Sequence, residues 1–287
     1  MNKEQEADYL NRLHREILDV MDVIDNICKK KGLNYYIASG SLLGAIRHKG
    51  FIPWDDDLDI TMPRPDFDKF IKLCDTDLPD GYYLDWITKN SNYYRLFAKV
   101  CKKNTLFSEK FSDDFYSEYG IFVDIFPLDD SFGYSSKIEF RKKIIDKFKI
   151  MLSLKKQVAK GLHIKYLFLK PFSVKFLHKM ATKIMQIDNS KIGTNFYVNY
   201  GSQYPIRKKT SLKKYYEKTI KVQFEDRYYS IPEGYVQILE LTFGKNYMQI
   251  PPVEKRKTHY PHKVVFSDGV EMVFEQKDKK LSIEDTF

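Results

Sequence analysis

Hydrophobic and polar positions follow a helical period in several separate parts of the chain. Over residues 9–31, apolar residues recur every three or four positions, which predicts an amphipathic helix ended by Gly32. The same spacing predicts helices at 42–47, 65–74 and 235–243. Each of these segments is expected to bury one face against the rest of the protein.

Runs rich in β-branched and aromatic residues lie between these helices and predict strands. The runs are residues 33–38, 54–60, 82–88, 94–102, 119–130 and 197–202, with a hairpin arm at 222–231. Residues 136–183 have a helical pattern interrupted at Gly161 and Pro171. A strand, a turn, a helix and a second strand are thus predicted within residues 33–60, where most of the candidate chemistry lies.

The turn between the first strand and its helix is suited to bind an anion. It is Ser39-Gly40-Ser41, and its glycine allows backbone amides to approach a bound group closely. The turn precedes a helix N-terminus, where unpaired amides favour negative charge. We therefore expect Gly40 and Ser41 to bind phosphate, although such a turn by itself is weak support.

The acidic run within residues 54–60, WDDDLDI, is the second candidate. In a strand, Asp57 and Asp59 share one face while Leu58 and Ile60 point into the core. Two adjacent carboxylates repel each other unless a cation lies between them, and Mg²⁺ binds carboxylate and phosphate oxygens together. An acidic run alone is more often a solvated turn, but the turn and the acid pair together indicate phosphoryl or nucleotidyl transfer.

A third acid lies in the strand predicted at 119–130. Asp124 shares a face there with Phe122 and Phe126, so its carboxylate needs a partner that offsets desolvation. One explanation is a salt bridge with a lysine or arginine. The other is that this strand lies beside the strand of Asp57 and Asp59 and completes a metal site.

Positive charge is concentrated in one segment. The 287-residue chain has a net charge of +9, and residues 147–183 contain ten lysines and no acidic residue. Aromatic side chains alternate with lysines in this segment, which suits docking on an anionic membrane surface. A solvated helical face over an ordinary core explains the pattern equally well.

Other features predict a cytoplasmic protein, located peripherally on the inner membrane face if the lysine-rich segment docks there. No run of eighteen uncharged apolar residues is present, and the first residues are too charged for a secretory signal. The cysteines Cys28, Cys74 and Cys101 lack metal-binding or redox spacing. By pattern we divide the chain into a core (1–135), a basic helical insertion (136–221) and a C-terminal segment that completes the core (222–287).

The central stretch resembles a known family signature. Residues 40–45 (GSLLGA) and 47–59 (RHKGFIPWDDDLD) closely resemble the LicD family, bacterial phosphocholine transferases of cell-surface glycans that are related to the fukutin-type ribitol-phosphate transferases. The resemblance extends over residues 10–130 and resumes at 224–260. It implies an α+β, nucleotidyltransferase-like fold: a mixed sheet surrounded by helices, with helical additions in the second half. It also implies that Asp57, Asp59 and Asp124 are the catalytic, metal-binding acids.

The resemblance further implies the reaction and its partners. A phospho-alcohol group, with phosphocholine ahead of glycerol or ribitol phosphate, would move from a donor linked to cytidine diphosphate (CDP) to a sugar hydroxyl. The acceptor would be a lipid-linked glycan, such as a lipopolysaccharide or teichoic acid precursor, and the cofactor Mg²⁺ or Mn²⁺. Residues expected at the substrate are Gly40, Ser41, Arg47, His48, Lys49, Trp54, Asp55, Asp56, Lys255 and Arg256.

Two other functions fit parts of the sequence. A nucleotidyltransferase acting on a small molecule shares the Asp-x-Asp pair, but the linker RHKGFIPWDDD disfavours it. A nucleic-acid-binding module would use residues 147–183, yet that segment has no arginine and the module leaves the three aspartates unexplained. We therefore expect no nucleic-acid partner.

Overall fold

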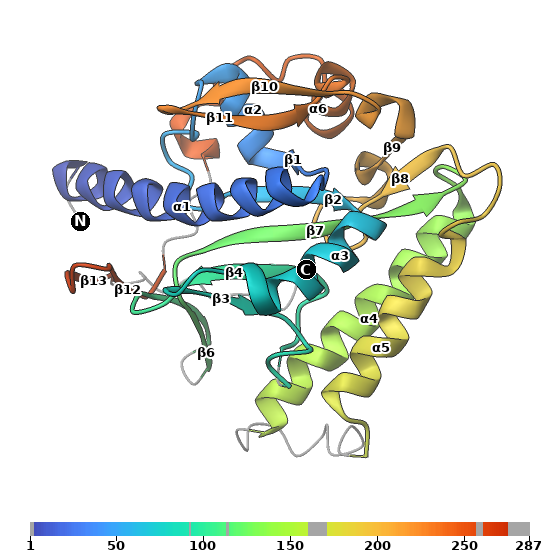
Figure 1. Cartoon of the computed structure of the whole chain (residues 1–287), viewed down its shortest axis with the longest axis horizontal. Helices are drawn as coiled ribbons and strands as arrows, with labels where there is room; N and C mark the ends of the chain where they lie inside the picture. Colours follow the sequence, from blue (N-terminus) through green and yellow to red (C-terminus); the bar gives the residue numbers. More distant parts are fainter. Residues whose placement is uncertain (1–2, 92, 113–114, 160–170, 257–260, 275–287) are drawn as a thin grey trace.

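The computed structural model describes residues 3–91, 93–112, 115–159, 171–256 and 261–274 (Figure 1). The helices are α1 (Lys3–Lys31), α2 (Ser39–Arg47), α3 (Arg64–Asp77), α4 (Ser136–Ala159), α5 (Val174–Met185) and α6 (Tyr235–Phe243). The strands are β1 (Tyr36–Ile37), β2 (Asp59–Pro63), β3 (Tyr82–Asp85), β4 (Ala98–Lys102), β5 (Leu106–Ser112), β6 (Phe115–Tyr119), β7 (Phe122–Ser131), β8 (Phe196–Val198), β9 (Thr210–Leu212), β10 (Thr219–Phe224), β11 (Arg227–Pro232), β12 (Lys263–Val265) and β13 (Glu271–Val273).

A mixed sheet forms the centre of the described structure. Its main path runs β1-β2-β7-β4-β3, and β8 and β9 extend it beyond the end of β7. β2 and β7 are parallel, whereas β4 is antiparallel to β7. Helices α1 and α3 pack against this sheet (Figure 1). The arrangement confirms the predicted α+β class.

The long first helix forms as its apolar stripe predicts. Leu13, Ile17, Met21 and Ile24 lie along one side of α1 and are buried in the main core. Gly32 ends the helix with a φ of +63°, which a glycine adopts without strain. Helices α3 and α6 also lie where their patterns predict. A proline in the first turn of α3 marks the start of that helix, and Gly244 marks the end of α6.

The strand predicted at 54–60 is wrong in extent, because β2 begins only at Asp59. Pro53 and three consecutive aspartates are poor strand formers, and the Asp55 N–H donates to the Ile52 carbonyl in a turn. The predicted alternation of burial still holds, since Leu58 is fully buried and Asp57 is partly exposed. A loop, and not a strand, therefore carries the first three acids.

Two parts of the C-terminal region also differ from expectation. Residues 222–231 lie in a complete hairpin, β10 and β11, which turns at Glu225-Asp226. Residues 263–274, for which we predicted no element, contain β12 and β13. β12 pairs with β5, a strand also absent from the prediction. Such pairings join segments far apart in the chain, so local patterns carry little trace of them.

The second half adds a pair of helices with a small core of its own. α4 and α5 lie side by side (Figure 1) and enclose a second apolar cluster that includes Ile145, Leu152, Leu177 and Ala181. The predicted break at Gly161 lies outside the described residues. Within the described ranges, no helix combines the length and the apolarity that crossing a bilayer requires.

Candidate functional site

The strand carrying Asp59 lies beside the strand carrying Asp124, as predicted. β2 and β7 pair in a register that places these two residues directly opposite each other. The Asp124 N–H donates to the Leu58 carbonyl at 3.0 Å, and the Asp59 N–H donates to Ser41 Oγ at 2.9 Å. Because Ser41 is buried, this hydrogen bond holds the backbone of Asp59, the first residue of β2, in a fixed position. The turn predicted at residues 39–41 is wrong, because these residues already form the first turn of α2. Phosphate binding by Gly40 and Ser41 stays a prediction.

The loop before β2 gathers three further carboxylates. Asp55, Asp56 and Asp57 each place one oxygen within 4.8 Å of the other two. Over the described residues, no other set of three acidic, histidine or cysteine side chains is this tight. The predicted trio of Asp57, Asp59 and Asp124 is therefore more widely spaced, and Asp57 is the residue that the two sets share.

Burial and repulsion by neighbouring carboxylates raise the pKa values of Asp55, Asp56, Asp59 and Asp124. Burial raises the pKa of Asp59 well above its usual range, and the charges of Asp57 and Asp124 raise it further. Burial, together with Asp57 and Asp56, raises the pKa of Asp55 to about 9. Burial also raises the pKa of Asp124, although Lys99 acts in the opposite direction. The site thus carries more negative charge than its surroundings balance.

Two lysines that the sequence analysis did not single out face these acids. Lys99 on β4 donates to Asp124 Oδ1 at 2.5 Å, so the salt-bridge explanation for Asp124 is confirmed. The two strands also pair, but completion of a metal site by Asp124 stays a prediction. Lys209, at the end of the turn Ile206–Lys209, donates to Ser39 Oγ at 3.0 Å, and its charge acts on Asp59. Burial lowers the pKa of Lys209 to about 8. Lys99 interrupts an otherwise apolar run in β4, and this interruption was a usable signal in the sequence. Lys209 lies in a basic run and has no such signal.

A histidine on α1 contacts the backbone of the acidic loop. The His14 Nε2 lies 2.8 Å from the carbonyl oxygen of Asp55, and the His14 ring stacks on Phe51 at 3.8 Å between centroids. The sequence prediction missed this role because His14 lies on the same helical face as Leu10 and Leu18, where a histidine is usually a packing residue. Burial lowers the pKa of His14.

The β10–β11 hairpin clamps the loop that leads into the acids. The Phe51 N–H donates to Glu225 Oε1 at 2.9 Å, and the Glu225 N–H donates to the Lys49 carbonyl at 2.7 Å. A Cβ on Gly44 would lie 2.4 Å from the Gly50 carbonyl oxygen, so glycine at this position lets the loop pass closely over α2. The hairpin and α2 therefore set the path of residues 49–51 jointly.

Several predicted substrate residues gather beside the acidic loop. Arg256 stacks over the ring of Trp54 at 4.3 Å, and the charge of Arg256 together with burial lowers the pKa of Arg47. Arg47 Nη1 donates to the Tyr247 carbonyl at 3.1 Å, and the His48 ring meets Trp54 edge-on. Within the described ranges, neither arginine forms an ion pair. Two arginines are thus gathered at Trp54, the residue that precedes the acidic run.

For two predicted substrate residues, Lys49 and Lys255, the structure gives no side-chain contact with the cluster around Trp54. Lys49 is exposed and has a φ of +60°, and its backbone carbonyl bonds to the hairpin. The side chain of Lys255 lies outside the described part of the chain. Their roles stay predictions.

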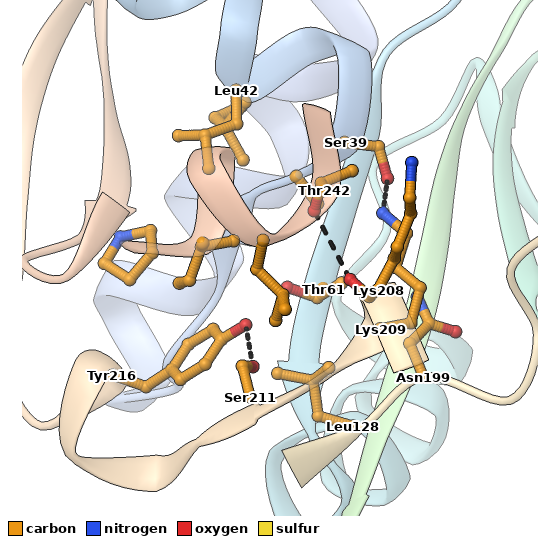
Figure 2. A pocket seen from close by; sticks show the side chains of 15 residues that line it. Ser39, Leu42, Thr61, Leu128, Asn199, Lys208, Lys209, Ser211, Tyr216 and Thr242 are labelled. Atoms are coloured by element: carbon orange, nitrogen blue, oxygen red, sulfur yellow. Dashed lines mark hydrogen bonds between the residues drawn. The ribbon is translucent and has the colours of Figure 1, made fainter. Parts of the chain in front are cut away.

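Two cavities in the described part of the chain are not lined by the acids. A cavity of ≈ 30 Å³ lies beside the start of α2, between Ser39, Thr61, Ser211 and Lys209 (Figure 2). This volume holds about one water molecule and is far too small for a nucleotide. A shallow hollow of ≈ 490 Å³ between α3 and β3 contains none of the predicted site residues. We therefore place the chemistry at the partly exposed acids.

The acids and cations together suit phosphate chemistry. Hard divalent cations such as Mg²⁺ bind carboxylate oxygens, and the raised pKa values of Asp55 and Asp59 indicate carboxylates without sufficient countercharge. Asp55, Asp56, Asp57 and Asp59 could hold such an ion. The adjacent arginines and Lys209 could contact phosphate oxygens. The same arrangement serves either transfer of a nucleotide or transfer of another phosphoryl group.

Comparison with known proteins agrees with this chemistry. Residues 32–159 match the family described as LicD/FKTN/FKRP, nucleotidyltransferase domain. The chain is 27% identical over 253 residues to the lipopolysaccharide cholinephosphotransferase LicD of Haemophilus influenzae, covering 85% of this chain and 92% of that protein. It is 32% identical over 106 residues to an uncharacterised protein of Rickettsia typhi, covering 36% of this chain and 33% of that protein. The matched domain, residues 32–159, is a LicD-family domain, and it contains Asp57, Asp59 and Asp124.

Proposed function

We propose that the protein transfers a phospho-alcohol group, phosphocholine in the first instance, from a CDP-linked donor to a sugar hydroxyl of a cell-surface glycan. The observation that carries the proposal is the register of β2 and β7, which pairs Asp59 with Asp124 next to the acidic loop. The named activity of the Haemophilus influenzae relative, which this chain matches over most of its length, supports the choice of phosphocholine.

In this reaction the acceptor oxygen forms a bond to the phosphorus that carries choline. The bond between that phosphorus and the bridging oxygen breaks, and cytidine monophosphate leaves with the bonding electrons. A bound Mg²⁺ or Mn²⁺ would neutralise the donor diphosphate and the leaving phosphate. Asp57 and Asp59 would hold this ion. Asp124 would either share it or accept the proton of the acceptor hydroxyl.

The positive groups around the acids would bind the rest of the donor. Arg47 and Arg256 lie on the Trp54 side of the acidic loop, and Lys209 lies on the α2 side near Asp59. Their fixed charges would stabilise the negative charge that develops on the leaving phosphate. A quaternary ammonium binds to aromatic faces. The partly buried rings of Trp54 and Tyr204 would offer such faces, although a cation of the protein already lies over each ring, Arg256 over Trp54 and Lys209 over Tyr204.

The test is a comparison of donors. The purified chain with MgCl₂ and a choline-free lipopolysaccharide is incubated with the CDP esters of choline, glycerol and ribitol, and released cytidine monophosphate is measured. We expect release from the choline ester that depends on acceptor and is abolished by EDTA and by Asp59→Asn. Asp80→Asn, at an exposed aspartate remote from the site, is the matched control.

Release from the glycerol or ribitol ester alone would overturn the choice of choline while keeping the mechanism. Release of pyrophosphate from a nucleoside triphosphate would overturn the proposal in favour of nucleotidyl transfer.

We also propose that one face of α5 docks on anionic lipid, which would bring the acids to a lipid-linked acceptor. Lys175, Lys179 and Phe176 are exposed on α5, whose opposite side packs into the second core. Residues 160–170 of the predicted lysine-rich segment lie outside the described structure. Reversal of charge at Lys175 and Lys179 is expected to weaken binding to anionic vesicles, unlike reversal at the exposed Lys72 and Lys103. Equal binding to neutral vesicles would refute it.

A further inference from the structure

A row of three charged residues crosses the sheet at the site. β2 and β7 pair Asp59 with Asp124, and β4 and β7 pair Asp124 with Lys99. Residues directly opposite each other on neighbouring strands project their side chains to the same face of the sheet. The order across three adjacent strands is therefore carboxylate, carboxylate, ammonium.

The Lys99 ammonium is held firmly and is shielded from water. Its side chain is 1% exposed, and Nζ lies 2.5 Å from Asp124 Oδ1. The ammonium also lies 3.1 Å from the centroid of the Phe122 ring and 5.1 Å from that of Tyr119. A buried ammonium is strongly unfavourable without an anion, and aromatic faces supply additional attraction. Lys99 is thus a built-in cation of the site.

The position of Lys99 bears on how many metal ions the site takes. Enzymes that use two metal ions hold them about 3.5–4 Å apart, on carboxylates that the two ions share. A second ion on the Asp124 side of the site would lie close to the ammonium that already donates to Asp124 Oδ1. Two positive charges at such short separation repel each other strongly in a buried setting, so the Lys99 ammonium disfavours a second metal ion there.

We propose that the Lys99 ammonium is the permanent second cation of the site, so that the protein binds a single divalent ion. The inference rests on the proposed function, because it concerns the metal that this function requires. Lys99 balances the charge of Asp124, and the single metal ion balances the charges of Asp57 and Asp59. Lys99 thereby fixes the stoichiometry of the metal centre.

The test counts metal ions independently of turnover. The full chain is titrated with MnCl₂, with and without cytidine diphosphate, and free Mn²⁺ is measured by electron paramagnetic resonance. We expect one bound Mn²⁺ per chain in both titrations and no Mn²⁺–Mn²⁺ coupling in frozen-solution spectra. Lys99→Met removes the ammonium and frees Asp124, so we expect a second, coupled Mn²⁺ in that variant.

Lys102→Met is the matched control, because Lys102 lies on the same strand but pairs with Glu16 and Asp19. The Lys102→Met variant is expected to bind one Mn²⁺ per chain, like the wild type. Two coupled ions in the wild type would overturn the inference while leaving the proposed function standing. One ion in a folded Lys99→Met variant would also overturn it. If that variant does not fold, the wild-type count decides alone. Absence of any bound Mn²⁺ would overturn the metal assignment itself.

Discussion

Replacement of Asp55 by asparagine should stabilise the metal-free protein, and by an amount that depends on pH. The Asp55 carboxylate lies in the acidic loop, close to those of Asp56 and Asp57. Burial is the main cause that raises its pKa from 3.8 to about 9, and the charges of Asp57 and Asp56 add to it. Asparagine has nearly the same shape and carries no charge, so it removes both the desolvation and the repulsion.

The sign and size of the effect follow from proton linkage. Between pH 3.8 and about 9 the folded state keeps the Asp55 proton, while the unfolded state releases it. The folded state then binds more protons, so its stability falls as pH rises, by about 1.4 kcal/mol per pH unit for one full proton. At pH 7 this amounts to about 4 kcal/mol, and repulsion shared with neighbouring acids makes that value a ceiling. Below pH 4 the difference should vanish.

Urea unfolding in EDTA at pH 4 and pH 7, followed by circular dichroism, measures this difference. We expect the free energy of unfolding of Asp55→Asn to exceed that of the wild type by roughly 2–4 kcal/mol at pH 7 and to equal it at pH 4. Asp80→Asn should change neither value, because the Asp80 side chain is exposed. Addition of MgCl₂ should raise the stability of the wild type more than that of the variant. An equal difference at both pH values, or a less stable variant at pH 7, would refute the reasoning.

Arg64→Met should destabilise the fold by about 3–5 kcal/mol in urea unfolding, because the fully buried Asp129 loses its two hydrogen bonds from Arg64. The additional change Asp129→Leu should restore most of that loss, and a double variant as unstable as the single one would contradict this. Gly44→Ala should lower thermal stability by about 1–3 kcal/mol, since its Cβ meets the Gly50 backbone at 2.4 Å, and an unchanged melting midpoint would count against the contact. With burial lowering the pKa of Lys209 to about 8, wild-type kcat/KM should fall above pH 8, whereas Lys209→Arg should retain activity to higher pH. Identical pH profiles would exclude a role for that charge.

Elements and residues with local signals could be located from the sequence. The apolar stripe of α1 and the glycines after α1 and α6 lie within or next to single helices, so periodicity and end signals located them. The stretch from Gly40 to Asp59 holds the short helix and the acidic run within twenty residues, and family resemblance added Asp124. The proximity of the Asp59 and Asp124 strands could therefore be predicted from the sequence.

The groups around the acidic loop depend on long-range packing. The contact of Lys209 with Ser39 spans 170 positions, that of Glu225 with Phe51 spans 174, and that of Arg47 with Tyr247 spans 200. Each depends on where a distant segment packs. No local pattern distinguishes Lys209 or Glu225 from an ordinary surface charge, and Arg47 was expected at the substrate only through the family resemblance. The sequence likewise misplaced the start of β2, because strand pairing begins where a partner strand lies, and that partner is set by the fold.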